Sequence, residues 1–278
     1  MRLGTFRDDE GTVFAGRLEG KDVHRLAAPS MLDWLAGEGL ERSGEAHGLA
    51  ELTPLAPVPE PPSVRDFYAF EGHVAAGWRR RGEDIPEYWY EAPAFYFSNP
   101  ASIVGPGEAV RRPAACEMLD FELEIAAVIG SGGEIAGFTL MNDWSARDVQ
   151  ARELTVGLGP HKAKDFATSL GPYLVTPDEL PYEDGRLHIE ARVSVNGREV
   201  TRSDASAQHF GWPEIVAQAA RDTRLRPGDV LGSGTLAGGC LLELGPQDLG
   251  GGGERWIEPG DVVALHAEGL GTLETPVG

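Results

Sequence analysis

The sequence predicts a β-rich α+β fold with few helices, preceded by a small N-terminal appendage. Apolar and polar residues alternate over residues 181–201, which is the pattern of strands that bury one face. Helical periodicity is limited to a few short stretches, and these do not alternate with the strands as they would in a doubly wound parallel sheet. No glycine-rich phosphate-binding pattern lies between a strand and a helix, so nucleotide binding is not expected.

The first 53 residues form a small polar segment that a proline-rich stretch separates from the rest. Asp9–Gly11 is predicted as the turn of a hairpin, and Ser30 as the N-cap of a short helix that reaches Leu35. Residues 54–62 contain five prolines in nine positions, and such a run is stiff and extended. We therefore expect a boundary there, with residues 63–278 forming the main domain.

Two neighbouring stretches, 119–129 and 142–150, organise the chain. Glu122 and Glu124 alternate with apolar residues, which predicts a strand with both carboxylates on one face. Asp143 follows after a glycine-containing turn, and three carboxylates suit a hard divalent ion such as Mg²⁺, Mn²⁺ or Ca²⁺. The alternative is a solvated edge strand. The apolar run that ends the strand favours burial on both faces, and buried paired glutamates need a partner.

The segment before this strand joins functional side chains to a run of arginines. A strand over residues 64–68 leads into a helix that includes His73, for which a surface position is the alternative to a functional one. Arg79–Arg81 either clamp an anionic substrate or neutralise the solvated end of this helix.

Turn chemistry predicts most of the remaining elements. Ser145–Asp148 resembles a capping box that starts a helix reaching about Leu154, and Asn196–Gly197 is typical of a type I′ hairpin turn. Two Pro-Gly-Asp turns, at 227–229 and 259–261, each introduce an apolar strand. The other expected elements are strands at 95–97, 103–107 and 173–175, a loop at 157–164, a helix at 213–225, a glycine-rich segment at 232–245 that lets backbone approach a ligand, and a final hairpin at 268–278.

Composition argues against several classes of partner. The formal net charge is −20, from 24 Lys plus Arg against 44 Asp plus Glu, which discourages binding to nucleic acid or to anionic membranes. No apolar run has the length of a membrane helix, and the N-terminus shows no secretory signal, so a cytoplasmic location is expected. Cys116 and Cys240 are interpreted as ordinary buried or semi-buried thiols. Two of the three lysines, Lys162 and Lys164, share one HKAK segment, which indicates a position that needs a compact ammonium group unless the clustering is chance.

These stretches resemble the fumarylacetoacetate hydrolase family over Val64–Gly278. The most specific feature is a strand that ends in Glu-x-Glu and is followed by NDWSARD. The resemblance implies a β-sandwich roll with a mixed sheet, commonly assembled as a homodimer, in a shorter, bacterial-type member of the family. The matching strings are DFYAFEGH, LDFELEIAAVIG, MNDWSARDVQ, GPHKAKDFATS, GPYLV, GSGTLAG, and PGDVV with EGLGTL.

The resemblance also implies roles for individual residues. The implied metal ligands are Glu122, Glu124, Asp143 and Asp66, with Thr168 close to the metal. The implied catalytic residues are His73 as general base, Glu243 as the group that orients it, and Lys164 and Gln150 at the developing oxyanion or the substrate carbonyls. The implied substrate-binding residues are Tyr68, Tyr96 and Thr235, to which the basic run adds Arg80 and Arg81.

Together these features predict a metal-dependent hydrolase that cleaves a carbon–carbon bond in a diketo acid, either an acylpyruvate or a fumarylacetoacetate-like compound. A divalent ion, Mg²⁺ with Mn²⁺ or Ca²⁺ as alternatives, would stabilise an enolate, and His73 would take a proton from water. One alternative is an isomerase or decarboxylase of the 2-hydroxyhepta-2,4-diene-1,7-dioate type, which needs no attacking water. Another is a metal-binding family member without activity. The expected partners are the small diketo acid and a second copy of the chain.

Overall fold

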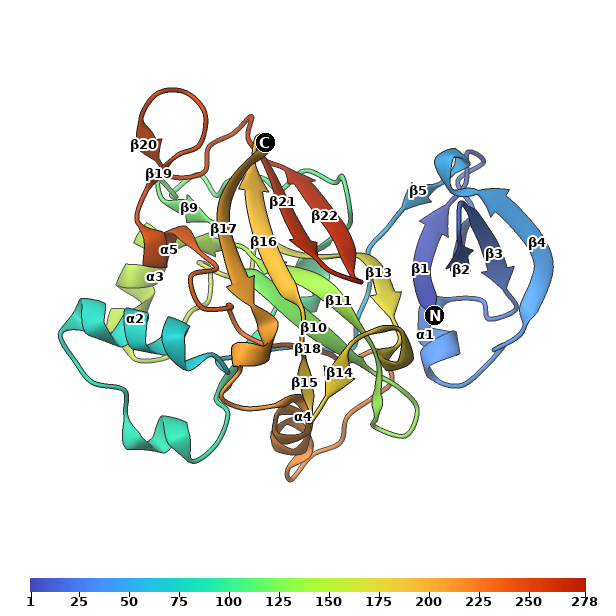
Figure 1. Ribbon diagram of the computed structural model, residues 1–278, viewed down its shortest axis with the longest axis horizontal. Coiled ribbons are helices and arrows are strands. Elements are labelled where there is room, and N and C mark those ends of the chain that lie inside the picture. The colour runs from blue at the N-terminus through green and yellow to red at the C-terminus, as the bar shows by residue number, and fades with distance from the viewer.

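The structure is a computed structural model of all 278 residues, and Figure 1 shows it as a small N-terminal lobe beside a larger one. The small lobe contains β1 (Arg2–Arg7), β2 (Val13–Glu19), β3 (Asp22–Leu26), α1 (Met31–Leu35), β4 (Arg42–Gly48), η1 (Leu49–Glu51) and β5 (Thr53–Pro54). The predicted hairpin is confirmed, because β1 and β2 pair antiparallel. The predicted cap is also confirmed, since Ser30 Oγ accepts a hydrogen bond from the Asp33 amide at 3.3 Å.

The larger lobe is built on a mixed sheet. Its strands in this sheet are β6 (Val64–Phe67), β7 (Phe95–Ser98), β8 (Ile103–Val104), β10 (Leu123–Ile129), β11 (Ile135–Asp143), β13 (Thr168–Val175) and β18 (Val230–Gly232). The order across the sheet is β4-β3-β2-β1-β13-β11-β10-β18-β6-β7, with β5 beside β1 and β8 beside β13. The β6–β18 pair is parallel, whereas β10 is antiparallel to both its neighbours. The predicted β-rich fold with a mixed sheet is confirmed.

The first strand joins the two lobes. β1 pairs antiparallel with β13 through Arg2–Val175 and Leu3–Leu174, so the N-terminal segment extends the edge of the main sheet. A core of 15 buried residues spans both lobes and includes Leu3 from β1 and Ala126 from β10. The domain boundary at residues 54–62 stays a prediction.

A second, four-stranded sheet packs on the main sheet. It has the order β17-β16-β21-β22, from β16 (Glu190–Val195), β17 (Arg198–Asp204), β21 (Val262–Ala267) and β22 (Gly271–Pro276). Figure 1 shows these strands in front of β10 and β11, and a core of 42 buried residues fills the space between the sheets and the helices around them. Leu123 and Ile125 of β10 belong to this core, whereas Ala126 and Val128 belong to the core shared with the N-terminal lobe. Strand β10 is therefore buried on both faces, as predicted.

Short elements complete the larger lobe. Its helices are α2 (Glu71–Arg81), α3 (Arg147–Glu153), α4 (Trp212–Ala220) and α5 (Leu241–Leu244), and its 3₁₀ turns are η2 (Glu87–Tyr90), η3 (Pro100–Ser102), η4 (Leu154–Val156), η5 (Pro177–Glu179) and η6 (Ala205–Ala207). Three small two-stranded pairs are formed by β9 (Leu119–Asp120) with β12 (Ser145–Ala146), β14 (Tyr182–Glu183) with β15 (Arg186–Leu187), and β19 (Gln247–Asp248) with β20 (Glu254–Arg255). None of the helices is long and apolar enough to cross a membrane.

Turn predictions in the second half of the chain agree with the structure. Asn196 and Gly197 have φ angles of 53° and 77°, the left-handed pair that a type I′ turn requires. In the two Pro-Gly-Asp turns, the aspartate side chain accepts a hydrogen bond at 2.8 Å from a backbone amide three residues earlier, Asp229 from Arg226 and Asp261 from Glu258. Each turn leads into a strand, β18 or β21.

The predicted capping box is wrong. Ser145 lies in β12, where pairing with Asp120 holds it in extended backbone, and its hydroxyl donates to the Asp143 carbonyl at 3.0 Å. Helix α3 begins after Ala146, which makes no side-chain cap.

Two further predicted elements have different ends. The strand predicted over residues 119–129 is split into β9 and β10, because its first part pairs with β12 and its second with β11. The helix predicted over 213–225 ends at Ala220, because Arg221 is extended and Asp222 has a φ of 59°. The splitting has a consequence for the site, since Glu122 lies in the break and Glu124 lies on the strand.

Candidate active site

Four buried carboxylates converge on one face of the main sheet. Asp143, Glu124 and Asp66 lie on β11, β10 and β6, and Glu122 directly precedes β10. One carboxylate oxygen from each of the four lies within 4.8 Å of the others. All four residues are at most 5% exposed. The structure therefore brings the predicted carboxylates together, and the solvated edge strand considered as the alternative is wrong.

A glycine leaves room for these oxygens. Strand β18 lies between β10 and β6, and its Gly232 pairs with Ala126 on one side and Asp66 on the other. A Cβ at this position would lie 2.6 Å from Asp66 Oδ1, 3.1 Å from Glu124 Oε2 and 2.5 Å from Met141 Cε. The close approach of carboxylates to backbone at Gly232 is the physical reason for glycine here.

We expect Gly232→Ala to weaken binding of a divalent ion, because the new methyl group displaces the oxygens of Asp66 and Glu124. Overpacking of this kind also costs about 1–3 kcal/mol of stability. Isothermal titration with Mg²⁺ and thermal melting measure the two effects. Gly253→Ala is the matched control, since a Cβ there meets nothing within 4 Å. Equal affinity in the two variants would contradict the assigned role of Gly232.

Two buried cations neutralise part of the negative charge. Lys164 Nζ donates to Asp143 Oδ2 at 2.5 Å and also to Glu122 Oε2. Arg147 pairs with Glu122 through Nη2 at 2.8 Å and donates from Nε to Asp120 Oδ2 at 2.8 Å. Lys162, the other lysine of the HKAK segment, pairs with Asp165 at the surface instead. Of the two clustered lysines, Lys164 alone enters the carboxylate group.

The carboxylate group fits a divalent cation. Asp66 Oδ1, Glu124 Oε2 and Asp143 Oδ1 are buried without a hydrogen-bond partner, although buried polar atoms normally have one. The four carboxylates and the adjacent Asp120 share only the two buried cations, so an excess of negative charge stays in a low-dielectric interior. Oxygen donors of this kind suit Mg²⁺, Mn²⁺ or Ca²⁺. Asp66, Glu122, Glu124 and Asp143 are the residues that could hold the ion.

The electrostatics of the protein distinguish Glu122, whose pKa is lowered, from Asp66, Glu124 and Asp143, whose pKa values are raised. Burial raises the pKa of both Asp66 and Glu124 well above the usual carboxyl range, and neighbouring carboxylates raise it further. Burial acts in the same direction on Glu122, but Lys164 and Arg147 together outweigh it and lower its pKa. The charged form is therefore favoured at Glu122, whereas burial favours the protonated form of Asp66 and Glu124 when no cation is bound.

Removal of divalent ions is expected to lower the melting temperature, because the carboxylate oxygens that have no hydrogen-bond partner then also lose the ion. Returning an ion at about 100 times its Kd should restore about 2.7 kcal/mol. Calorimetry of chelator-treated protein with and without Mg²⁺ measures the difference. An unchanged melting temperature would argue that the folded protein binds no such ion.

The raised pKa values of Asp66 and Glu124 predict the sign of a pH effect in chelator-treated protein. The folded state holds protons that the unfolded chain releases, so the free energy of unfolding falls as pH rises above the ordinary carboxyl range. In the ion-loaded protein the ion has replaced those protons, and the fall should be smaller. Melting temperatures of both forms across this pH range test the prediction, and equal slopes would contradict it.

His73 and Glu243 form a hydrogen-bonded pair beside the carboxylates. His73 lies on α2 and Glu243 on α5, and His73 Nδ1 is 2.7 Å from Glu243 Oε1. Glu243 Oε2 accepts a hydrogen bond from the Gly238 amide at 2.9 Å. Burial opposes the charged form of Glu243, but the bond to His73 prevails and lowers its pKa. The pair can hold the imidazole with its Nδ1 proton toward Glu243 and its Nε2 lone pair available.

Asp120 links this pair to the carboxylate group. Its carboxylate accepts hydrogen bonds from the Leu241 and Leu242 amides at 2.8 and 2.9 Å and also pairs with Arg147. Asp120 thereby positions α5, and Arg147 connects α5 to Glu122. Glu153 positions another part of the site, because its Oε2 accepts from the His161 amide at 2.8 Å and so holds the loop that ends at Lys164.

A cleft with a volume of about 720 Å³ opens onto the His73–Glu243 pair and onto Asp66 and Glu122 of the carboxylate group. Tyr68 and Tyr96 line it, and the Tyr96 hydroxyl donates to Asp143 Oδ2 at 2.6 Å. Thr235 also lines it, with its hydroxyl 3.4 Å from Glu124 Oε1. Burial raises the pKa of Tyr68 to about 12, so this phenol keeps its proton and can donate to a ligand. The apolar part of the lining includes Phe67, Ala76, Phe95, Leu154 and Leu242.

The other predicted site residues differ in whether they line the cleft. Arg80 and Arg81 line the cleft, whereas Arg79 does not. Gln150 lines it and accepts a hydrogen bond from Arg147 Nη1 at 3.1 Å. Thr168 does not line the cleft; it lies opposite Asp143 on β13, with its hydroxyl 3.3 Å from that of Ser98. The roles assigned to these residues stay predictions.

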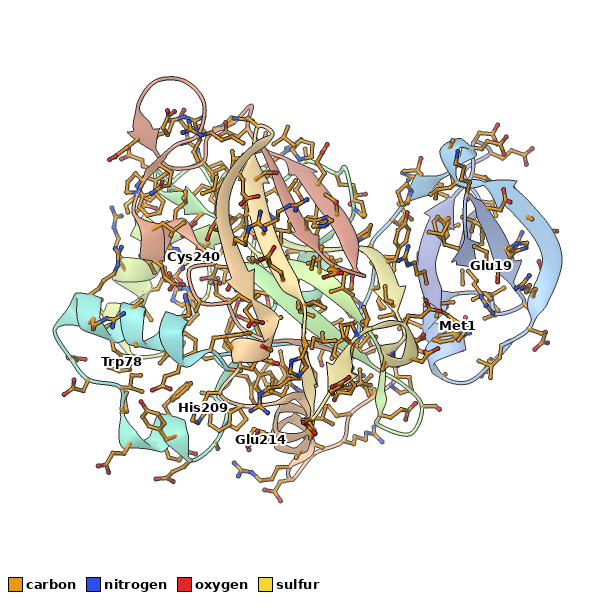
Figure 2. All side chains as sticks on the ribbon, viewed as in Figure 1. Met1, Glu19, Trp78, His209, Glu214 and Cys240 are labelled. Carbon is orange, nitrogen blue, oxygen red and sulfur yellow. The ribbon has the colours of Figure 1, made fainter.

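Three residues of the site were not assigned a role from the sequence. Arg147 belongs to the NDWSARD string, and its membership of that string was the available signal. Asp120 lies just before the Glu-x-Glu pattern, in the LDFELEIAAVIG string, and this position was its only signal. Cys240 gave no signal beyond its type, yet Figure 2 places it inside the larger lobe next to α5, where burial raises the pKa of its thiol well above the usual range.

A mixed sheet, four buried carboxylates that could hold a cation and a histidine–glutamate pair on one cleft are the features to compare with known proteins. The family model described as "Fumarylacetoacetate (FAA) hydrolase C-terminal" matches residues 63–278. The chain therefore belongs to the fumarylacetoacetate hydrolase family, as its sequence motifs predicted.

Individual relatives differ in the reaction that their names give. The fumarylacetoacetase of Arabidopsis thaliana is 34% identical over 270 residues, which cover 72% of this chain and 63% of that protein. The chain thus spans less than two thirds of this relative. The oxaloacetate tautomerase YisK of Bacillus subtilis is 27% identical, covering 90% of this chain and 81% of that one. The solved structure of 5-carboxymethyl-2-hydroxymuconate delta-isomerase from Mycobacterium smegmatis is 28% identical with a TM-score of 0.74 and covers 100% of this chain and 99% of that chain.

Proposed function

We propose that the protein is a divalent-metal-dependent hydrolase that cleaves a carbon–carbon bond in a diketo acid, an acylpyruvate or a fumarylacetoacetate-like compound. The observation that supports this most is the His73–Glu243 pair, held at 2.7 Å and facing the same cleft as Asp66 and Glu122 of the carboxylate group. Hydrolysis needs a base for water and a cation for the carbonyl oxygens, and both can act on one bound molecule here.

In the proposed reaction, Glu243 holds the Nδ1 proton of His73, so that Nε2 accepts a proton from a water molecule in the cleft. The water oxygen attacks the acyl carbonyl carbon, and the bond from this carbon to the neighbouring methylene carbon breaks. The electron pair of that bond stays on the methylene carbon, which then takes up the proton that His73 accepted from water. The products of an acylpyruvate are a carboxylic acid and pyruvate, and one water molecule is consumed.

The charge that develops on oxygen needs stabilisation. A bound divalent ion would supply Lewis-acid stabilisation of the enolate formed as the bond breaks. Lys164 adds a fixed ammonium group, and its pairing with Asp143 and Glu122 keeps it charged, because these partners outweigh burial and raise its pKa. The hydroxyls of Tyr68 and Thr235 can donate to the substrate carboxylate, and Arg80 and Arg81, which also line the cleft, can pair with a second anionic end.

The fate of water distinguishes this proposal from its rivals. When a panel of acylpyruvates and fumarylacetoacetate is turned over in ¹⁸O-labelled water, the label should appear in the carboxylate of the released acid. Cleavage without label in that acid would rule out attack by water.

An isomerase or tautomerase of 2-hydroxyhepta-2,4-diene-1,7-dioate type is the second candidate. The similarity to the M. smegmatis isomerase over nearly its full length favours it, and the His73–Glu243 pair could equally move a proton between two carbon atoms. Such an enzyme would shift the substrate's absorbance and exchange its carbon-bound protons with deuterium from solvent, while releasing no acid. A decarboxylase would instead release carbon dioxide.

Three further features follow from the family resemblance, and we propose them on that basis. The resident ion is Mg²⁺, which competition with Mn²⁺ and Ca²⁺ for the stripped protein would test. The assembly is a homodimer, which the molar mass from light scattering would test. The location is cytoplasmic, which fractionation of cells that express the protein would test.

A further inference from the structure

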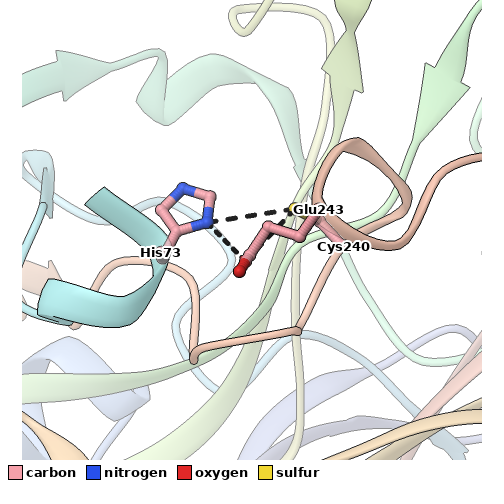
Figure 3. A group of neighbouring side chains, drawn as sticks. All are labelled: His73, Cys240 and Glu243. Atoms are coloured by element: carbon pink, nitrogen blue, oxygen red, sulfur yellow. Dashed lines mark hydrogen bonds and ion pairs between the residues drawn. The ribbon is translucent and has the colours of Figure 1, made fainter. Parts of the chain in front are cut away.

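We propose that His73, Cys240 and Glu243 form a second metal site, which takes a soft divalent ion such as Zn²⁺ or Cd²⁺ and inactivates the histidine. Binding to this site is independent of the reaction, whereas the inactivation rests on the proposed function of His73 as base. Figure 3 shows the three side chains facing one another, with His73 on α2, Cys240 at the start of α5 and Glu243 within α5.

The distances between the ligand atoms match a tetrahedral ion. Cys240 Sγ is 3.9 Å from His73 Nδ1 and 3.6 Å from Glu243 Oε1, and all three atoms lie within 4.8 Å of one another. An ion with bonds of about 2.0–2.3 Å to nitrogen, oxygen and sulfur spaces its ligands by roughly 3.3–3.7 Å. The 2.7 Å separation of Nδ1 and Oε1 has to widen, as the ion replaces the hydrogen bond between them, and the 3.9 Å separation of Sγ and Nδ1 has to shorten slightly.

The donor types separate this site from the carboxylate group. Thiolate and imidazole prefer Zn²⁺ and Cd²⁺, whereas Mg²⁺ and Ca²⁺ prefer oxygen ligands. Cys240 has no exposed surface and closes the inner side of the site, while His73 and Glu243 line the cleft. A fourth position therefore opens toward the cleft, where water can complete the tetrahedron. The cleft can thus hold a hard ion and a soft ion at neighbouring positions.

Ion binding at Nδ1 removes the base. A neutral imidazole has one proton, and when Nδ1 binds the ion this proton must sit on Nε2. Nε2 then has no lone pair with which to accept a proton from water. The thiol of Cys240 loses its proton to solvent as the thiolate binds, so the affinity of the site should decrease as pH falls.

The test uses the Mg²⁺-loaded protein titrated with Cd²⁺. Thiolate ligation gives a sulfur-to-Cd²⁺ charge-transfer absorption in the ultraviolet, which requires no activity. We expect this band to saturate at one equivalent in the wild type and in Cys116→Ser, the control for the other buried thiol. Cys240→Ser should lose the band. Position 240 is the N-cap of α5, where serine is favoured, so this variant should fold, and its melting temperature checks that it does.

Turnover of a diketo acid is followed in the same titration. Activity should fall in step with the band in the wild type and in Cys116→Ser, whereas Cys240→Ser should need more than about tenfold more Cd²⁺ for the same loss, equivalent to about 1.4 kcal/mol of binding free energy. A wild type without the band, or a band that persists in Cys240→Ser, would overturn the site. A saturated band with unchanged turnover would overturn the inactivation, and with it the role of His73 as base, while leaving the metal site in place.

Discussion

His73→Ala is expected to lower kcat on the best diketo acid by about 10²- to 10⁴-fold, the usual contribution of a general base. The four carboxylates do not contact this imidazole through a hydrogen bond, so the affinity for Mg²⁺ should be unchanged. Steady-state kinetics and isothermal titration measure the two quantities on the same preparation. Turnover equal to that of the wild type would remove His73 from the reaction.

Glu243→Gln is the companion variant. Glutamine keeps the length of the side chain and an oxygen that can accept from Nδ1, but it lacks the charge that stabilises the protonated imidazole. We expect a smaller loss of kcat than in His73→Ala, with KM nearly unchanged, because Glu243 acts through His73. A higher KM with an unchanged kcat would indicate that Glu243 binds substrate instead.

Glu124→Gln is expected to have the largest effect on metal binding. Glu124 has no exposed surface and holds one of the oxygens without a hydrogen-bond partner, so an amide in its place removes the negative charge and replaces one carboxylate oxygen with a nitrogen that cannot bind the ion. The affinity for Mg²⁺ should fall by more than the roughly 10- to 100-fold that loss of an outer partner of a metal ligand costs. Isothermal titration of chelator-treated protein measures it.

The matched control for this variant is Glu134→Gln, the same change at an exposed position in the turn between β10 and β11. Its affinity should equal that of the wild type. Undiminished binding in Glu124→Gln would place the ion elsewhere and remove β10 from the metal site.

The carboxylate group could be predicted from the sequence because local patterns determine most of it. Glu124 lies on a strand whose apolar run showed burial on both faces, and Asp143 ends the next strand. Antiparallel pairing of β10 with β11 then brings Glu124 and Asp143 close together. Asp66 comes from a distant strand, and it was placed by the family motif and not by any local pattern.

Features that depend on long-range packing could not be predicted from the sequence. Gly232 belongs to a glycine-rich segment, but its place between Asp66 and Glu124 follows from the order β10-β18-β6, which periodicity does not reveal. Cys240 meets His73 across 167 residues of chain. The capping box failed for a related reason, because pairing of Ser145 with Asp120 outweighs a local capping preference.

The central claim is that a divalent ion held by the carboxylates is required for carbon–carbon bond cleavage. The most direct test strips the purified protein with chelator, restores Mg²⁺ or Mn²⁺, and follows the loss of diketo-acid absorbance across acylpyruvates and fumarylacetoacetate. The account predicts no turnover in the stripped protein and recovery with the ion, with release of an acid together with pyruvate or acetoacetate. Cleavage that continues in the stripped protein would contradict it. So would the absence of turnover of every compound in the panel when the ion is bound.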